Sequence, residues 1–377
     1  MMVNGSVLPS SQDSRTSGKM LRFHWSMSSA GEKWRGAKAR SAQSGVPDLN
    51  AHLEFCRAAE DCNIESLLTA VGFHRPDPIA LAAALGVLTN KIKFMVACRS
   101  GLLSPTLFVQ QVNTVSVLTG GRICLNVVGG HTPEEQRYYG DFLTHDDRYE
   151  RTDEFLTICR SFWSGATEVN FQGKYFHIEK ARLNTPFLYG QGPEIYVGGA
   201  SPKAVELAAK HASCFWTLPA SPEKLFPRIQ HVLQAGVEVG LLVSLLGRST
   251  RREAVGAAES MLAELGSSPK KTHKEFSRRS DSVAFGSTLA MAESEPEWLT
   301  NCLWTGAVPY LGAPSVALVG SFEEIAGALW EYKQAGIAQF LFMGWPDLEE
   351  MRLFSREVLP RIRQRESETR VQEAACN

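Results

Sequence analysis

The sequence lacks the features that mark several large classes of protein. Its 377 residues contain no run of eighteen apolar residues, so no transmembrane helix and no membrane partner are expected. The eight cysteines form no CxxC pair and no zinc-finger spacing, which favours reduced thiols and a cytoplasmic location over a disulfide framework. With a net charge of −1 and a pI of about 6.8, the chain has no basic excess for nucleic acid.

Signatures of several enzyme chemistries are missing as well. No GxGxxG opens a predicted helix, which argues against an open dinucleotide-binding sheet. No GxSxG is present, and the expected strand ends carry neither a glycosidase-like carboxylate pair nor His and Asp at metal-ligand spacing, so no metal site is expected. By elimination, a redox barrel with a bound organic cofactor fits best.

What the sequence does contain is a regular alternation of apolar, β-rich runs with helical patterns. Eight strands are expected at 21–27, 64–71, 92–100, 122–130, 196–201, 214–220, 237–247 and 338–345. A helical pattern follows each of them, as parallel strands buried on both faces require. The prediction is therefore an α/β fold, a closed (β/α)8 TIM barrel, with a doubly wound open sheet as the alternative.

One long segment interrupts this alternation before the last strand. Residues 266–314 follow the seventh helical pattern, and segments of this length are usually lids or disorder. The apolar stretch near Trp304 and Tyr310 predicts that the later half packs over the barrel mouth. The expected organisation is a disordered N-terminal tail at 1–20, a single TIM-barrel domain at 21–365 that includes this insertion, and a flexible C-terminal tail at 366–377.

Candidate binding residues lie where strands end, because a TIM barrel places its active site at the C-terminal ends of its strands. In YVGGASPKAVELAA two glycines end a strand and Ser201 precedes a helix, an arrangement that can bind an anion but equally suits a plain tight turn. In FLTHDDRYE, His145 and Tyr149 lie four residues apart. Both can donate to a phosphate if a helix begins near Asp146, and a helix cap with a surface salt bridge is the alternative.

Several blocks, in order and spacing, resemble the bacterial-luciferase-like flavin monooxygenases, with the alkanesulfonate monooxygenases as the closest branch. The blocks are KIKFMVACRSGLLSPTLFVQQVNTVSVLTGGRICLNVVGG, FLTHDDRYERTDEFL, FQGKYFHIEKARL, YVGGASPKAVELAAKH and GWPDLEEMRLFSREVLP. The likeness runs from about Leu21 to Pro360. It implies a TIM barrel that takes reduced FMN from a separate NAD(P)H:flavin reductase, reacts it with O2 to oxidise a small molecule, and forms a homodimer or a dimer of dimers.

The same resemblance implies positions for the cofactor and the catalytic groups. The phosphate site falls on His145, Tyr149, Gly199, Ala200 and Ser201, and the flavin ring lies near Asn126, Val128 and Gly129. The catalytic candidates are His74 and Arg75 at the end of the second strand, with His24 and His131 as second choices for proton transfer. For all three histidines, a satisfied loop histidine is an equally consistent interpretation.

Departures from the sulfonate branch bear on the substrate. Arg75 aligns with the active-site Cys of that branch. Leu242 and Ser244 align with its Arg and His, and Leu311 with its lid-loop Arg. Leu218 and Trp345 align with its Trp and Tyr. An alkanesulfonate needs fixed cations or donors around its head group. The substrate predicted is therefore not a simple alkanesulfonate but a larger or less charged molecule, such as one of specialised metabolism. Two other functions stay open: hydride transfer with a deazaflavin, and a flavin-binding protein that has lost its chemistry.

Overall fold

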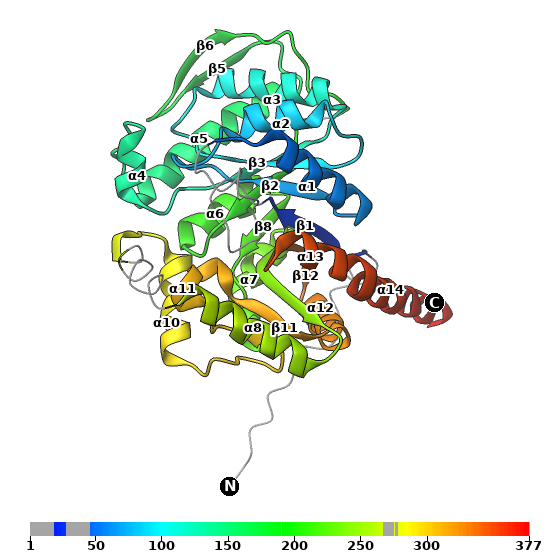
Figure 1. Cartoon of the computed structure of the whole chain (residues 1–377). Coiled ribbons are helices and arrows are strands. Elements are labelled where there is room, and N and C mark those ends of the chain that lie inside the picture. The colour runs from blue at the N-terminus through cyan, green and yellow to red at the C-terminus, as the bar shows by residue number, and fades with distance from the viewer. Residues whose placement is uncertain (1–18, 28–45, 190, 267–274, 276–277, 377) are drawn as a thin grey trace.

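Eight parallel strands form a closed barrel in the computed structural model, which describes residues 19–27, 46–189, 191–266, 275 and 278–376 (Figure 1). The strands are β1 (Arg22–Ser26), β2 (Ser66–Thr69), β3 (Lys93–Cys98), β4 (Ile123–Val127), β7 (Ile195–Gly198), β8 (Cys214–Thr217), β9 (Glu238–Arg248) and β12 (Ile337–Gly344). They pair in the order β12–β1–β2–β3–β4–β7–β8–β9, and β9 pairs with β12 to close the ring. The predicted TIM barrel is confirmed.

Helices cover the outside of the barrel, so the strands are buried on both faces and their apolar runs are nearly continuous. These helices are α1 (Leu49–Asp61), α2 (Pro78–Gly86), α3 (Pro105–Thr119), α5 (His145–Trp163), α6 (Pro202–His211), α7 (Pro222–Gln234), α8 (Arg251–Leu265) and α12 (Phe322–Gln334). Most begin at a residue whose side chain accepts a hydrogen bond from the first turn, as Asp48, Ser104 and Ser321 do.

Two strand pairs lie outside the predicted eight strands. The antiparallel hairpin of β5 (Val169–Gln172) and β6 (His177–Ala181) follows α5 and lies at the top of Figure 1. The strand β11 (Ala317–Ser321) pairs with β9 beyond the point where β8 ends, and β10 (Leu303–Trp304) pairs with β11. Because β9 is eleven residues long and β8 only four, β9 has an edge left for β11 to occupy.

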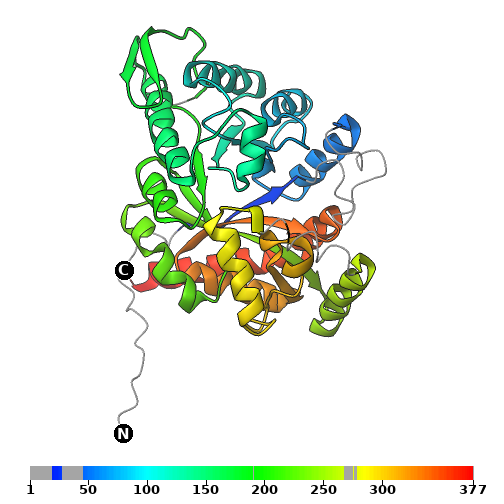
Figure 2. The ribbon, with the colours of Figure 1, turned by 90° about the vertical axis from the view of Figure 1, so that its left-hand side faces the viewer.

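The insertion before the last barrel strand is folded where the structure describes it. It contains α10 (Val283–Ser294), β10, the short helix α11 (Val308–Leu311) and the 3-10 turn Ala313–Ser315. Residues 267–274, 276 and 277 lie outside the described part of the chain. In Figure 2, α10 is the long yellow helix in the lower half of the molecule, whereas the β5–β6 hairpin lies in the upper half.

The segment predicted to be a flexible C-terminal tail, 366–377, is helical as far as Cys376. After α13 (Asp347–Leu353) and a π-helical turn (Phe354–Val358), α14 (Leu359–Cys376) continues to the end of the described chain and projects from the barrel in Figure 1. Glu366 anchors it, because this buried carboxylate accepts hydrogen bonds from the Leu21 amide and Lys333. Of the predicted N-terminal tail, residues 1–18 lie outside the described residues.

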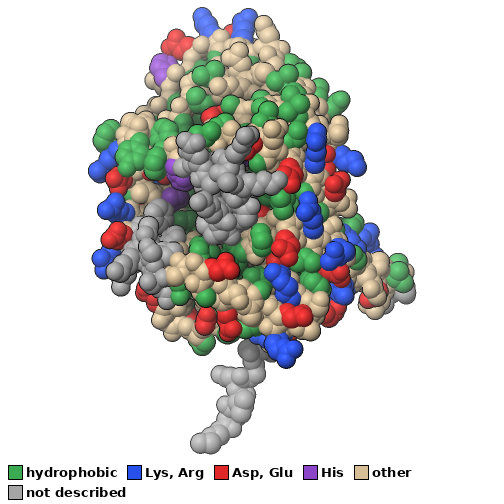
Figure 3. Space-filling model, viewed as in Figure 1, with side chains coloured by type: hydrophobic (Ala, Val, Ile, Leu, Met, Phe, Trp, Pro, Cys, Tyr) green, Lys and Arg blue, Asp and Glu red, His purple; other side chains and the backbone are tan. Residues whose placement is uncertain are grey.

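In the part of the chain that the structure describes, no helix is both long and apolar enough to span a bilayer. On the face shown in Figure 3, acidic and basic side chains are interspersed. Neither sign of charge dominates this face, in agreement with the net charge of −1 of the whole chain.

Candidate active site

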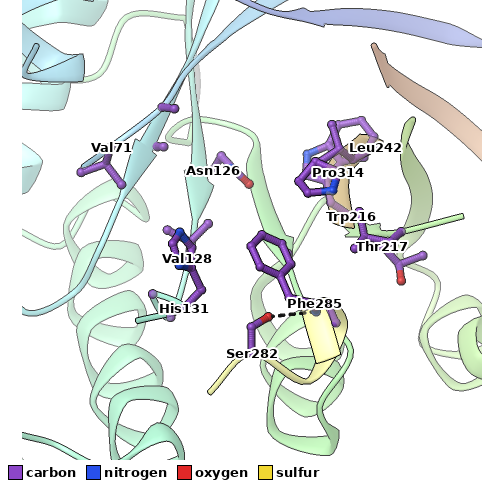
Figure 4. Close-up of a pocket in the computed structure, with 18 of the residues that line it drawn as sticks. Val71, Asn126, Val128, His131, Trp216, Thr217, Leu242, Ser282, Phe285 and Pro314 are labelled. Atoms are coloured by element: carbon purple, nitrogen blue, oxygen red, sulfur yellow. Dashed lines mark hydrogen bonds between the residues drawn. The ribbon is translucent and has the colours of Figure 1, made fainter. Parts of the chain in front are cut away.

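A cavity of about 290 Å³ opens at the C-terminal ends of the barrel strands. Residues at or just beyond the ends of β2, β3, β4, β7 and β8 contribute to its wall, together with Leu242 of β9 and Leu341 of β12. The insertion adds Ser282 and Phe285, and also Pro314, which lies beside Leu242 and Trp216 (Figure 4). Most of the lining is apolar, and its volume is near the small end of the range of roughly 300–1,000 Å³ for ligand sites.

The glycine pair after β4 lets the chain turn sharply into the cavity wall. Gly130 has φ +80°, a left-handed conformation that favours glycine, and a Cβ built there would lie 1.9 Å from Gln136 Nε2. A Cβ at Gly129 would meet the Tyr149 ring at 3.1 Å. The pair therefore lets the backbone after β4 pass directly against the Tyr149 ring and the Gln136 side chain, which a Cβ at these positions would displace.

Next to these glycines, Tyr149 connects the cavity to the start of α6. Its ring lies 5.0 Å from the ring of His145, and its hydroxyl is hydrogen-bonded to Ser201. Burial raises the pKa of Tyr149, while the Ser201 hydrogen bond acts in the opposite direction. Ser201 also accepts a hydrogen bond from the Ala204 amide at 3.2 Å, which caps α6. These hydroxyl and ring N–H groups suit a phosphate at the rim of the cavity.

Asn126 on β4 supplies an unsatisfied acceptor to the same wall. Its side chain is 8% exposed, and its Oδ1 is buried without a hydrogen-bond partner among the described residues. In Figure 4 this oxygen points into the cavity. Buried acceptors are normally hydrogen-bonded, so a bound molecule with an N–H group at this point would complete the site.

Arg99 at the end of β3 is the charged side chain of the cavity wall. Its Nη2 lies 2.8 Å from Glu135 Oε1 on α4 (Pro133–Tyr138), and both side chains are almost fully buried. The Nε and Nη1 atoms have no partner among the described residues. Because Glu135 already balances the guanidinium, the pair adds donors to the cavity but no net charge.

The insertion is fastened to the wall of the cavity through His131. The His131 carbonyl accepts hydrogen bonds from Ser280 Oγ at 2.7 Å and from the Asp281 amide at 3.1 Å. Phe285 stacks on the His131 ring with the centroids 5.2 Å apart. The buried Arg148 ties the two parts further, because it donates to the Gly129 carbonyl and pairs with Asp281. Burial lowers the pKa of His131, which favours the neutral imidazole.

Comparison with known proteins identifies the family of this barrel. A model described as luciferase-like monooxygenase matches residues 21–339. The chain belongs to that family. The predicted luciferase-like resemblance and the prediction of a flavin-type oxidoreductase are confirmed at the level of the family, whereas the alkanesulfonate branch is not singled out.

Solved structures share the luciferase-like fold at low sequence identity. A riboflavin lyase with modified FMN and riboflavin is 19% identical, with a TM-score of 0.73 over 92% of each chain. An EDTA monooxygenase from Chelativorans sp. BNC1 is 21% identical, with a TM-score of 0.75 over 92% of this chain and 94% of that one. An F420-dependent secondary alcohol dehydrogenase is 19% identical, with a TM-score of 0.65 over 91% and 99%. At these identities the likeness extends to the fold alone.

Most residues predicted to hold the cofactor of this luciferase-like protein lie close together. Asn126, Val128, Gly129, Tyr149 and Gly199 line the cavity. His145 and Ser201 do not line the cavity themselves but contact Tyr149, which does. Ala200 is the exposed residue between Gly199 and Ser201.

The predicted catalytic residues are more dispersed. His131 lines the cavity, but His74 and Arg75 are not among its lining residues, and His74 is exposed. His24 lies inside the barrel with no exposed surface, and its two ring nitrogens contact Ser66 and Gln339. An imidazole held in this way has no access to the cavity, so His24 is not retained in the proposed site.

The residues predicted for the site do not include three residues of the luciferase-like cavity, namely Arg99, Trp216 and Phe285. Arg99 directly follows the third apolar strand and was expected at the barrel mouth, but no role was assigned to it. Trp216 lies within a strand and resembles a core residue in sequence, and Phe285 lies in an insertion with no simple periodicity. Trp345, which the sequence placed near the mouth, packs instead with Trp304 in a separate cluster.

Proposed function

We propose that the chain is a monooxygenase that uses reduced FMN from a separate flavin reductase to oxidise an uncharged organic molecule with O2. The observation that carries the proposal is the apolar cavity at the strand ends, with the unsatisfied Asn126 oxygen in its wall and the Tyr149–Ser201 pair at its rim. Bound reduced FMN would supply the two electrons that reduce one oxygen atom of O2 to water while the other enters the substrate.

The described residues fit FMN in two parts. Asn126, Val128 and Gly129 would contact the ring system, with Asn126 Oδ1 accepting a hydrogen bond from a ring N–H. His145, Tyr149, Gly199, Ala200 and Ser201 would hold the phosphate. His131, whose ring stacks on Phe285 and is kept neutral by burial, would transfer protons. The insertion would exclude water from the reacting centre.

The charge of the cavity supports a neutral substrate. Among its lining residues, the only fully ionised side chain is Arg99, and Glu135 balances it. Leu218 and Leu242 line the cavity at the positions where the sulfonate branch has Trp and Arg. A sulfonate would therefore lose its hydration without gaining fixed cations in this part of the wall.

A second groove bears on the choice between FMN and a deazaflavin with an anionic tail. It adjoins Tyr149 and is lined by three lysines and by the carboxylates Glu150, Asp153, Glu154 and Glu206. The lysines are already paired, Lys174 with Asp147, Lys203 with Glu206 and Lys210 with Asp153. An acidic tail continuing from the phosphate would meet more carboxylates than cations here, which favours FMN.

Replacing Tyr149 by phenylalanine tests the phosphate site. The change keeps the ring beside His145 but removes a donor to a dianionic phosphate, so FMN affinity should fall about ten- to hundredfold. Riboflavin, which lacks the phosphate, should bind both proteins alike in anaerobic fluorescence titrations. Tyr175→Phe in the neighbouring groove is the control, because its hydroxyl contacts Asp147 and should not affect FMN. Equal losses for FMN and riboflavin would argue against this assignment of the phosphate.

Oxygen reactivity tests the whole proposal. Photoreduced FMN is mixed anaerobically with excess protein and then with aerated buffer, and its absorbance is followed with time. Bound reduced FMN should reoxidise at a rate different from that of free reduced FMN, and NADH alone should not support oxygen consumption. A deazaflavin enzyme that does not bind FMN should leave the rate of the free flavin unchanged even at saturating protein. That result would overturn the proposed function.

A further inference from the structure

Trp216 forms a fixed part of the cavity wall at the end of β8. Its indole stacks flat on Tyr196, with centroids 5.4 Å apart and planes 11° apart, and meets the ring of His24 edge-on at 5.7 Å. Gly240 on β9 makes room for it, since a Cβ at that position would lie 2.1 Å from Trp216 Cζ3. The rings of Tyr196 and His24, together with the space above Gly240, therefore hold the indole in one orientation.

The indole N–H of Trp216 is unusual among the tryptophans of the described chain. Trp25, Trp163 and Trp304 donate to Asp347, Asn113 and Glu297 at 2.7–2.9 Å. Trp216 Nε1 is buried and has no acceptor among the described residues, although the side chain is only 4% exposed. Trp345 Nε1 also lacks an acceptor, but Trp345 does not line the cavity. Buried indoles usually find a partner, so the Nε1–H of Trp216, in a residue that lines the cavity, is a candidate donor to a ligand.

The surroundings of Trp216 determine what kind of ligand it would meet. Leu242 and Pro314 lie beside it in Figure 4, Leu341 belongs to the same hydrophobic cluster, and Leu218, two residues further along the chain, also lines the cavity. Asn126 and Val128, which the proposed function assigns to the flavin ring, lie across the cavity in Figure 4. The space between the two walls is thus mostly apolar, and the Trp216 indole and the Thr217 hydroxyl are polar groups of the lining on the side away from the proposed flavin.

We propose that Trp216 is a specificity-determining residue that donates a hydrogen bond to a neutral oxygen, such as a carbonyl, on an otherwise apolar substrate. This inference rests on the proposed function, because it assigns the opposite wall to FMN. An indole N–H can only donate, so the substrate group must be an acceptor. An apolar analogue without that oxygen would leave the N–H unsatisfied, and sites of this kind reject such analogues.

The test compares 1-tetralone with tetralin, two bicyclic molecules of nearly the same shape of which only the first carries a carbonyl. Binding to the full chain with FMN is measured by NMR titration. The native protein should bind the ketone about tenfold more tightly than the hydrocarbon, and Trp216→Phe should abolish that preference. Leu218→Ala, which removes wall area but no donor, should weaken both ligands and keep the preference. A preference that persists in Trp216→Phe, or no saturable binding of the ketone, would overturn the proposal.

A second measurement covers the case in which Trp216→Phe does not fold. In native protein with ¹⁵N-labelled tryptophan, the ketone should move one indole N–H resonance that tetralin leaves in place. If no indole resonance responds to the ketone, the hydrogen bond is absent. FMN titration of the same samples separates this inference from the proposed function. If FMN fails to bind, the flavin assignment is lost, whereas the ketone and hydrocarbon can still be compared on the FMN-free protein.

Discussion

Replacing Arg99 by leucine is expected to lower the free energy of unfolding by roughly 3–5 kcal/mol, the usual cost of removing one partner from a buried ion pair. Arg99 and Glu135 are 5% and 6% exposed, and their charged atoms lie 2.8 Å apart. In Arg99→Leu the Glu135 carboxylate stays buried without this cation, while its hydrogen bond of 3.4 Å from the Phe73 amide remains. The loss should appear as a lower urea midpoint with an unchanged slope.

Two variants make the cause of this loss identifiable. The double replacement Arg99→Leu with Glu135→Leu should recover most of the stability, because no charge is then left buried. Arg182→Leu removes an ion pair with Glu168 at a similar distance of 2.7 Å, but the Arg182 side chain is 71% exposed. That change should cost at most about 1 kcal/mol. If Arg99→Leu is no more harmful than Arg182→Leu, the buried pair does not stabilise the barrel mouth.

Acid should destabilise the barrel through His24, by about 3 kcal/mol between pH 6.5 and pH 4. Burial lowers the pKa of His24 from 6.5 to about 4. Gln339 donates its amide to Glu238, so its oxygen accepts the proton of His24 Nε2, and Nδ1 is left to accept from Ser66. The neutral ring is therefore satisfied on both sides, and protonation must charge an imidazole with no exposed surface.

The sign of this pH effect follows from the direction of the shift. Since the folded-state pKa lies below the unfolded-state value, the stability contributed by His24 is present above pH 6.5 and is lost as the pH falls through about 4. His24→Gln cannot take up the proton, so its unfolding free energy should fall less over this range. The exposed His231→Gln is the control and should follow the native protein. Parallel curves for native protein and His24→Gln would contradict the assignment.

The barrel was predictable from sequence because its signals are local. Each of the eight strands is an apolar run between turn residues, and the glycines after β4 and β7 mark where those strands end. The strand β11 was missed because its role depends on the unequal lengths of β8 and β9, which no local pattern reveals. At 366–377, polar composition hides the anchoring of Glu366 by residues distant in sequence.

The candidate site was predictable only where resemblance fixed its positions. Tyr149, Ser201 and His145 come together because α5 and α6 start at neighbouring strand ends. The histidines were ambiguous because sequence does not show which way a strand residue points. His24 faces the barrel interior, whereas His131, just beyond β4, faces the cavity. Trp216 needed the structure, since its unsatisfied N–H is defined by what surrounds it.

The way the insertion joins the barrel has a consequence for how such enzymes diversify. It leaves after β9 and α8 and returns as β11, which pairs with the far half of β9, so both of its junctions are built on one strand. A different segment inserted between the same two endpoints could change the part of the cavity wall that Phe285 and Pro314 form, while the other strand ends keep their positions. New substrate preferences could then arise by exchange or drift of this one segment, without redesign of the scaffold beneath it.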